Sequence, residues 1–130
     1  MRRLLISHAD RAVGGEWITG LTDYFQPYPI EVRRAFTGRE AIGLVEHGGI
    51  DAAILSVELP QMDGLNVLRI IRSIDAELPC VMLTAEASKR ILQRSLELGA
   101  YSVVTLPVDL AALKRVLAGL FRRCFEWQLE

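Results

Sequence analysis

The sequence predicts an α/β fold in which a five-stranded parallel sheet is wrapped by five helices. Three observations lead to this prediction. Short apolar runs alternate with helix-like patterns along the whole chain, as in repeated strand–helix units. The run 52–55 is apolar at every position, as expected for a central parallel strand covered on both faces. Capping residues precede several of the helix-like segments.

Length and composition favour one domain that covers residues 1–130. With 51% hydrophobic residues and a net charge of −1, the chain can bury a core and has no general attraction to nucleic acid or to anionic membranes. Its apolar runs are too short to cross a bilayer. The start, Met1 to Ile6, resembles a signal peptide, but its apolar stretch stops at Ser7 and His8. We therefore expect a cytoplasmic protein.

The two cysteines, Cys80 and Cys124, lie far apart in the sequence and belong to no CxxC pair. They are expected to be buried free thiols in a reducing compartment, and no metal site is predicted from them. The final pair, Leu129 and Glu130, is compatible with the remnant of a tag, so the natural protein is expected to extend further.

The first half of the chain predicts three strands and two helices. The strands are residues 3–7, 30–36 and 52–55. The first helix is indicated by apolar residues three to four positions apart and ends before Pro27; those residues are Val13, Trp17, Leu21, Tyr24 and Phe25. The second helix starts at the capping box 37–40 and ends near Gly48 and Gly49.

The second half predicts two further strands and three helices. A helix begins at Asp63 and Gly64, and its core face includes Val67, Leu68 and Ile71. The strands are residues 80–83 and 101–105, and between them a helix runs from a cap at Ser88 to a stop at Gly99. The last helix spans about residues 109–128, capped by Asp109, and is long enough to lead into another domain.

Three segments, in order and at matching intervals, resemble response-regulator receiver domains. They are LPQMDGLNVLRIIR (59–72), VMLTA (81–85) and LGAYSVVTLP (98–107). The resemblance covers essentially the whole chain. It implies the flavodoxin-like, doubly wound sheet of strand order 2-1-3-4-5 and a role in two-component, phosphorelay signal transduction. In such a sheet, ligands collect at the carboxyl ends of the first and third strands.

At these strand ends the chain departs from the family's chemistry. The family's acidic pair corresponds to His8 and Ala9, and only Asp10, one place later, is acidic. The phosphoacceptor aspartate, the lysine before the proline and the aromatic switch residue correspond to Ser56, Leu106 and Val103. Thr84 and Pro107 keep the family's pattern. Glu58 and Thr105 complete the predicted pocket.

These replacements remove the groups that phosphorylation needs. Mg²⁺ requires about six oxygen ligands with carboxylate charge, so its binding is predicted to be weak or absent, and no cofactor is expected. A hydroxyl such as that of Ser56 cannot form an acyl phosphate, and Leu106 offers no cation to a transferred group. The sequence therefore predicts a degenerate, pseudo-receiver domain that forms no aspartyl phosphate.

Other interpretations of the strand ends remain open. One is an ordinary phosphoacceptor domain that uses a non-standard residue. Another is an enzyme built on Ser56, His8 and Asp10, which the lack of a G-x-S-x-G elbow disfavours. A third is a sensor of a small ligand. Thr84 and Thr105, which report on or lie beside the phosphoryl group in the family, are expected here to satisfy local hydrogen bonds.

The last helix carries aromatic residues beyond those needed to cover a sheet. Phe121, Phe125 and Trp127, together with Tyr101, are candidates for a partner surface. The alternative is that the helix end folds back on the first helix beside Trp17. We expect a non-enzymatic protein-interaction module. Its partner is another protein, its own output domain or a second copy; nucleic acid and membrane are not expected.

Overall fold

The computed structural model describes residues 1–8, 16–86 and 88–126, in which five strands alternate with five helices. The strands are β1 (Arg2–Ser7), β2 (Ile30–Ala35), β3 (Ala52–Ser56), β4 (Cys80–Thr84) and β5 (Ser102–Thr105). The helices are α1 (Glu16–Phe25), α2 (Gly38–His47), α3 (Gly64–Ile74), α4 (Lys89–Glu97) and α5 (Leu110–Phe125). All strand pairs are parallel, in the order β2-β1-β3-β4-β5. The predicted fold class is confirmed.

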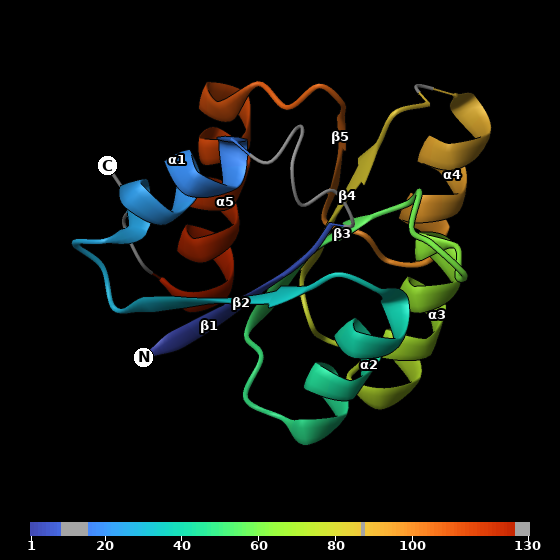
Figure 1. The fold of residues 1–130 in the computed structure, drawn as a ribbon, viewed down its shortest axis with the longest axis horizontal. Helices are drawn as coiled ribbons and strands as arrows, with labels where there is room; N and C mark the ends of the chain where they lie inside the picture. The colour runs from blue at the N-terminus through green and yellow to red at the C-terminus, as the bar shows by residue number, and fades with distance from the viewer. Residues whose placement is uncertain (9–15, 87, 127–130) are drawn as a thin grey trace.

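The helices cover both faces of the sheet (Figure 1). Helices α1 and α5 lie on one face, and α2, α3 and α4 lie on the other. Successive strand residues point to opposite faces: Leu4 and Ile6 pack with α1 and α5, whereas Leu5 packs with α2 and α3. Because every residue of β3 and β4 is buried, a one-residue slip would exchange the two cores and is strongly disfavoured.

The predicted caps are all present. The side chains of Thr37, Asp63, Ser88 and Asp109 each accept a hydrogen bond from an amide in the first turn of the following helix. These bonds satisfy donors that have no partner within the helix. The boundaries differ slightly from expectation: β3 and β4 each extend one residue further, to Ser56 and Thr84, and Tyr101 precedes β5. Val13 lies outside the described residues.

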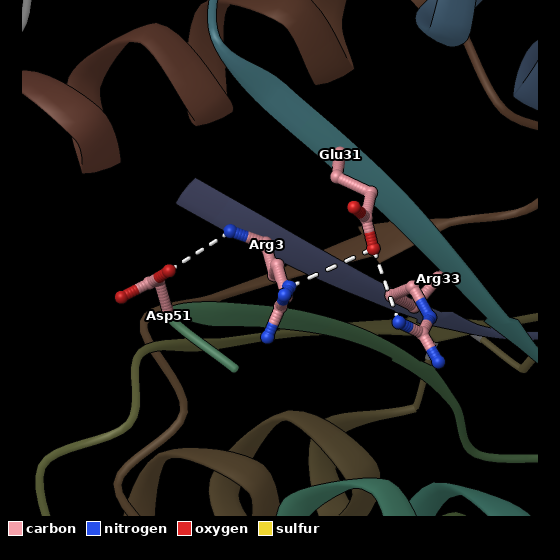
Figure 2. A network of polar contacts seen from close by, with 4 residues as sticks. All are labelled: Arg3, Glu31, Arg33 and Asp51. Atoms are coloured by element: carbon pink, nitrogen blue, oxygen red, sulfur yellow. Dashed lines mark hydrogen bonds and ion pairs between the residues drawn. The ribbon is translucent and has the colours of Figure 1, made fainter. Parts of the chain in front are cut away.

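Charged residues join the starts of β1, β2 and β3 (Figure 2). Asp51 accepts a hydrogen bond of 2.8 Å from the Arg3 amide, and Glu31 forms ion pairs with Arg3 and Arg33 at 3.6 and 3.1 Å. The paired side chains are about 36–45% exposed, so each pair adds little stability. They lie at the amino ends of the strands, away from the predicted site.

Arg72 at the end of α3 connects three segments of backbone. Its guanidinium donates hydrogen bonds to the carbonyl oxygens of Leu98, Gly99 and Leu78. Leu98 and Gly99 directly follow α4, and Leu78 precedes β4. The planar fork of arginine suits this several-fold contact better than the single ammonium of lysine.

The aromatic residues of α5 correct one prediction. Phe121 is only 1% exposed and packs against Phe25 of α1, with ring centroids 6.0 Å apart, so it is not available as a partner surface. Phe121 folds back on the first helix at Phe25, whereas the alternative interpretation expected the contact beside Trp17. Phe125 is half-buried, and the Cζ atom of the Arg2 guanidinium lies over its ring, 4.2 Å from the ring centroid. Tyr101 is also half-buried and packs against the α1–α5 core. Trp127 lies outside the described residues.

The cysteines differ in environment. Cys80 is buried, as predicted, and burial raises the pKa of its thiol to about 11. Cys124 is exposed on α5, so the expectation of a buried thiol is wrong there. The apolar stripe of α5 uses Leu113, Leu117, Leu120 and Phe121, and Cys124 lies outside this stripe.

The turn after β3 requires glycine at position 64. A Cβ added there would lie 1.9 Å from the Ser56 carbonyl oxygen, whereas a Cβ added to Gly43 of α2 meets nothing within 4 Å. We expect Gly64→Ala to lower the free energy of unfolding by roughly 3 kcal/mol or more, because backbone must move. Gly43→Ala, the matched control, should raise it by about 0.5–1 kcal/mol. Urea denaturation measures both; equal effects would contradict this account of the turn.

Candidate functional site at the carboxyl ends of the strands

Three buried polar residues end the three central strands. Ser7, Ser56 and Thr84 close β1, β3 and β4 and are 0%, 2% and 1% exposed. Parallel pairing brings these ends to one edge of the sheet, where α/β proteins of this type bind ligands. Ser56 and Thr84, which belong to the predicted site, therefore lie at this edge together with Ser7, and all three contribute neutral hydroxyl groups.

Ser56 is hydrogen-bonded to His8. The Nδ1 atom of His8 lies 2.9 Å from the Ser56 Oγ, and either group can donate, depending on the histidine tautomer. The His8 amide donates to the Ala35 carbonyl, and its ring lies edge-on to Trp17, with centroids 5.7 Å apart. The prediction that His8 and Ser56 lie on adjacent strand ends is confirmed.

The backbone around Ser56 is already committed to hydrogen bonds within the fold. The amide of Val57 donates to the Leu83 carbonyl, and the Gly64 amide donates to the Val57 carbonyl, both at 2.7 Å. An oxyanion hole would need an amide such as that of Val57 to point toward substrate. The nearly inaccessible Ser56 and these two bonds do not favour nucleophilic catalysis.

A cavity of about 460 Å³ lies between the end of β1, α1 and the segment before α5. Its lining is mainly apolar: His8, Glu16, Trp17, Leu106, Pro107, Val108 and Leu110. Leu106, at the position of the family's lysine, packs partly into the α1–α5 core, while its amide donates to the Thr84 carbonyl. An aliphatic side chain thus takes the place of a cation in this wall.

A second polar cluster surrounds the end of β4. The Glu58 carboxylate accepts hydrogen bonds from the Thr84 hydroxyl at 2.9 Å and from the Ala85 amide at 2.7 Å. The Thr84 hydroxyl also accepts from the Glu86 amide at 3.0 Å. These bonds confirm that Thr84 satisfies local partners. A cavity of about 320 Å³ adjoins this cluster, lined by Thr84, Ser88, Lys89, Ile91, Leu92, Val103 and Thr105.

The remaining predicted site residues are placed as follows. Val103 is half-buried, whereas Thr105 and Pro107 are exposed. Ala9 and Asp10 lie outside the described residues. Within residues 1–8, 16–86 and 88–126, no three histidine, cysteine or acidic residues are grouped closely enough to hold a metal ion.

Two features were not found from the sequence. One is the pair of hydrogen bonds that Glu58 makes with the end of β4. The other is the exposure of Leu92 and Leu96 on α4, which are 46% and 52% exposed. The available signal for α4 was spacing: Ile91 and Ser95, four positions apart, face the core, so Leu92 and Leu96, each one position later, lie on the adjoining side of the helix.

The fold and the site together indicate the class of protein to which this chain belongs. The sequence profile of the response regulator receiver domain matches residues 16–118, and the chain belongs to this family of signalling modules. Over 121 residues it is 36% identical to the response regulator MprA of Mycolicibacterium vanbaalenii, covering 93% of this chain and 51% of that protein. Over 100 residues it is 36% identical to the transcriptional regulatory protein TrcR of Mycobacterium tuberculosis, covering 77% and 38%.

Solved structures of receiver domains have the same fold. The fold matches a CheY-like receiver domain from Methanospirillum hungatei with a TM-score of 0.84 at 21% identity, covering 97% of this chain and 98% of the other. It also matches the receiver domain of the Francisella response regulator 1452, with a TM-score of 0.79 at 25% identity and coverages of 95% and 98%. The chain spans about half the length of the MprA proteins it matches. None of the helices described is both long enough and apolar enough to span a bilayer.

The two buried serines at the strand ends give a matched pair of variants. Ser56→Ala removes the bond to His8 and should lower the free energy of unfolding by about 1 kcal/mol. The Ser7 Oγ is buried without a hydrogen-bond partner among the described residues. Ser7→Ala should therefore leave stability unchanged or raise it by up to about 1 kcal/mol. Thermal or urea denaturation distinguishes the two, and a larger loss for Ser7→Ala would show that the hydrogen bonds are assigned wrongly.

Proposed function

We propose that this chain is a degenerate receiver domain that acts in signal transduction without being phosphorylated. It works by contact with a protein: its own output domain, another regulator or a second copy. The chain spans about half the length of the MprA proteins it matches, which supports an attached output domain. In this proposal no metal or other cofactor takes part.

The observation that most directly supports the proposal is the burial and hydrogen bonding of Ser56. It ends β3, where the family has its phosphoacceptor, and it is 2% exposed and hydrogen-bonded to His8. A phosphoryl group on this oxygen would have to break that bond and enter a buried position. The resulting ester would also lack the high-energy character of an acyl phosphate.

The surroundings of Ser56 support the same conclusion. His8, at a position of the family's metal-binding acidic pair, supplies an imidazole, which Mg²⁺ disfavours relative to carboxylate oxygen. Leu106 supplies no positive charge, and its partly buried side chain packs against the α1–α5 core. Neutral groups at buried strand ends also avoid the repulsion that clustered carboxylates produce. The domain is therefore expected to be stable without metal.

A partner surface is supported by the apolar residues of α4. Leu92 and Leu96 lie one turn apart and are both about half exposed. Beside them, the 320 Å³ cavity has Ile91, Leu92 and Val103 in its wall. Val103, in place of the aromatic switch residue, makes this region of α4 and β5 apolar without requiring a phosphorylation-dependent rotation. A docked protein would cover these side chains.

One alternative also has an observation in its favour. The 460 Å³ cavity beside His8 is mainly apolar and includes Glu16 and Trp17, and the Trp17 Nε1 is buried with no acceptor among the described residues. A small, mainly apolar ligand with a hydrogen-bond acceptor would suit this cavity. The enzyme alternative has no comparable support, because the amide next to Ser56 is used within the sheet.

Treatment with a small phosphodonor tests the proposal directly. After incubation with acetyl phosphate and Mg²⁺, intact-mass spectrometry should show no added phosphate on the wild type, because no carboxylate acceptor is present at Ser56. The variant Ser56→Asp should also remain unlabelled, since His8 and Leu106 still fail to hold metal and phosphate. Millimolar Mg²⁺ should shift the melting temperature of the wild type by less than about 1 °C. Labelling of the wild type, or a rise of several degrees with Mg²⁺, would refute the proposal.

The α4 surface is tested by changing its leucines. If two copies associate through it, the wild type should form dimers in sedimentation velocity at high concentration, and Leu92→Ser with Leu96→Ser should abolish them. The matched control is Ile74→Ser on α3, which removes another side chain that is 41% exposed and should leave the dimers intact. A dimer that survives the leucine changes would place the contact elsewhere, and a strictly monomeric wild type would exclude a second copy as partner.

A further inference from the structure

We propose that two copies of this chain associate edge to edge through β2, which pairs in antiparallel orientation with the β2 strand of the second copy, centred on Val32. The two sheets then join into one continuous sheet. The inference rests on the proposed function, since it takes a second copy as the partner, but it assigns the contact to an edge of the sheet and not to α4.

The strand β2 has main-chain groups that face outward from the sheet. Among the residues described, its only strand neighbour is β1, so it forms one edge of the sheet (Figure 1). The Ala35 carbonyl oxygen accepts a hydrogen bond of 3.2 Å from the His8 amide. Because the main-chain groups of successive strand residues alternate between the two sides, the amide and carbonyl of Val32 face away from β1. An edge of this kind can pair with a strand of another chain.

The charges on β2 suit a second copy of the same strand. Charged side chains on an edge strand usually discourage pairing. On β2, however, the two charges of opposite sign lie on the same side of the strand, with the Arg33 Nη1 3.1 Å from the Glu31 Oε1 (Figure 2). Antiparallel pairing about Val32 sets Glu31 of each copy opposite Arg33 of the other, and opposite charges in such cross-strand positions are stabilising. Because the contact has two-fold symmetry, the favourable pair occurs twice.

The α1 side of this edge has space for a second strand. A groove of about 330 Å³ lies beside β2, between the strand and α1. It is lined by two residues of β2 and four of α1: Val32, Arg34, Ile18, Thr19, Thr22 and Asp23. The last residue of β2, Ala35, is buried, whereas the other five are half-buried or exposed. The groove can therefore receive side chains that a second strand directs to this face.

The contact is small, so the dimer is weak. The strand β2 has 6 residues, and a strand of that length spans about 20 Å. Stable interfaces bury about 800 Å² on each partner, which is more than one strand edge provides, so we expect dimers at roughly 0.1–1 mM protein. The ion pairs that Glu31 makes within its own chain, with Arg3 and Arg33, are at least 36% exposed and compete little with those between copies.

Exchange of the two charges tests the proposal by sedimentation equilibrium. Glu31→Arg sets like charges opposite each other at both positions, as does Arg33→Glu, so each variant alone should dimerise at least about tenfold more weakly than the wild type. An equimolar mixture of the two variants should dimerise as the wild type does, because each arginine then faces a glutamate. Glu77→Arg, which reverses an exposed charge between α3 and β4, is the matched control and should leave the dimer unchanged.

The Val32 amide locates the contact. In ¹⁵N–¹H spectra of the wild type, it should shift and gain protection from hydrogen exchange as the protein concentration rises.

Four results would overturn the proposal. They are a wild type that stays monomeric at about 1 mM, a Val32 amide that is unchanged in a dimer, a mixture that dimerises no better than the single variants, and a dimer that Glu31→Arg leaves intact. If that last dimer is lost in Leu92→Ser with Leu96→Ser, the contact lies on α4. None of these results depends on labelling by a phosphodonor, so failure of the β2 contact is distinct from failure of the proposed function.

Discussion

Parallel pairing of β1, β3 and β4 is the constraint on which the rest of the structure depends. It brings Ser7, Ser56 and Thr84 to one edge and sets the interiors of the three strands between two helical layers. Since the interiors of these strands are buried on both faces, their register cannot slip without exchanging the two cores. The positions of the residues at the site are therefore fixed by packing in the strand interiors, away from the site itself.

Within that frame, the chain has replaced charge with neutral polar and aliphatic groups at the end of β1, the end of β3 and the start of the segment after β5. His8 and Ser56 are hydrogen-bonded to each other at 2.9 Å, and Leu106 packs against the α1–α5 core. The one carboxylate bound to the strand ends is Glu58, among the residues described, and it turns toward β4 and not toward β3. A receiver fold can thus keep its architecture while its polar edge takes on a different chemistry.

Sequence reasoning predicted the fold well because several independent signals agreed. The fully apolar β3, the caps at Thr37, Asp63, Ser88 and Asp109, and the matching segments all indicated one topology. The proximity of His8 and Ser56 also followed, since residues that end neighbouring parallel strands must meet. These features follow from the repeat periods of helices and strands, which the sequence of apolar and polar residues shows directly.

What could not be predicted depended on side-chain direction. Glu58 was recognised as a pocket residue, but its choice of Thr84 and Ala85 as partners depends on a loop conformation that periodicity does not determine. The aromatic residues of α5 were ambiguous because the same spacing suits a partner surface and a contact with α1. Phe121 is buried because the helix turns that side toward Phe25, while Cys124 lies just beyond the apolar stripe and is exposed.

The contacts of Arg72 bear on how this domain could move. One guanidinium is bound to carbonyl oxygens at the end of α4 and before β4, so the carboxyl end of α4 is anchored to α3. Any displacement of α4 that keeps these bonds must be a pivot about that anchored end, with the largest travel at its amino end near Ser88. A partner that binds Leu92 and Leu96 would then tilt α4 about the end that Arg72 holds.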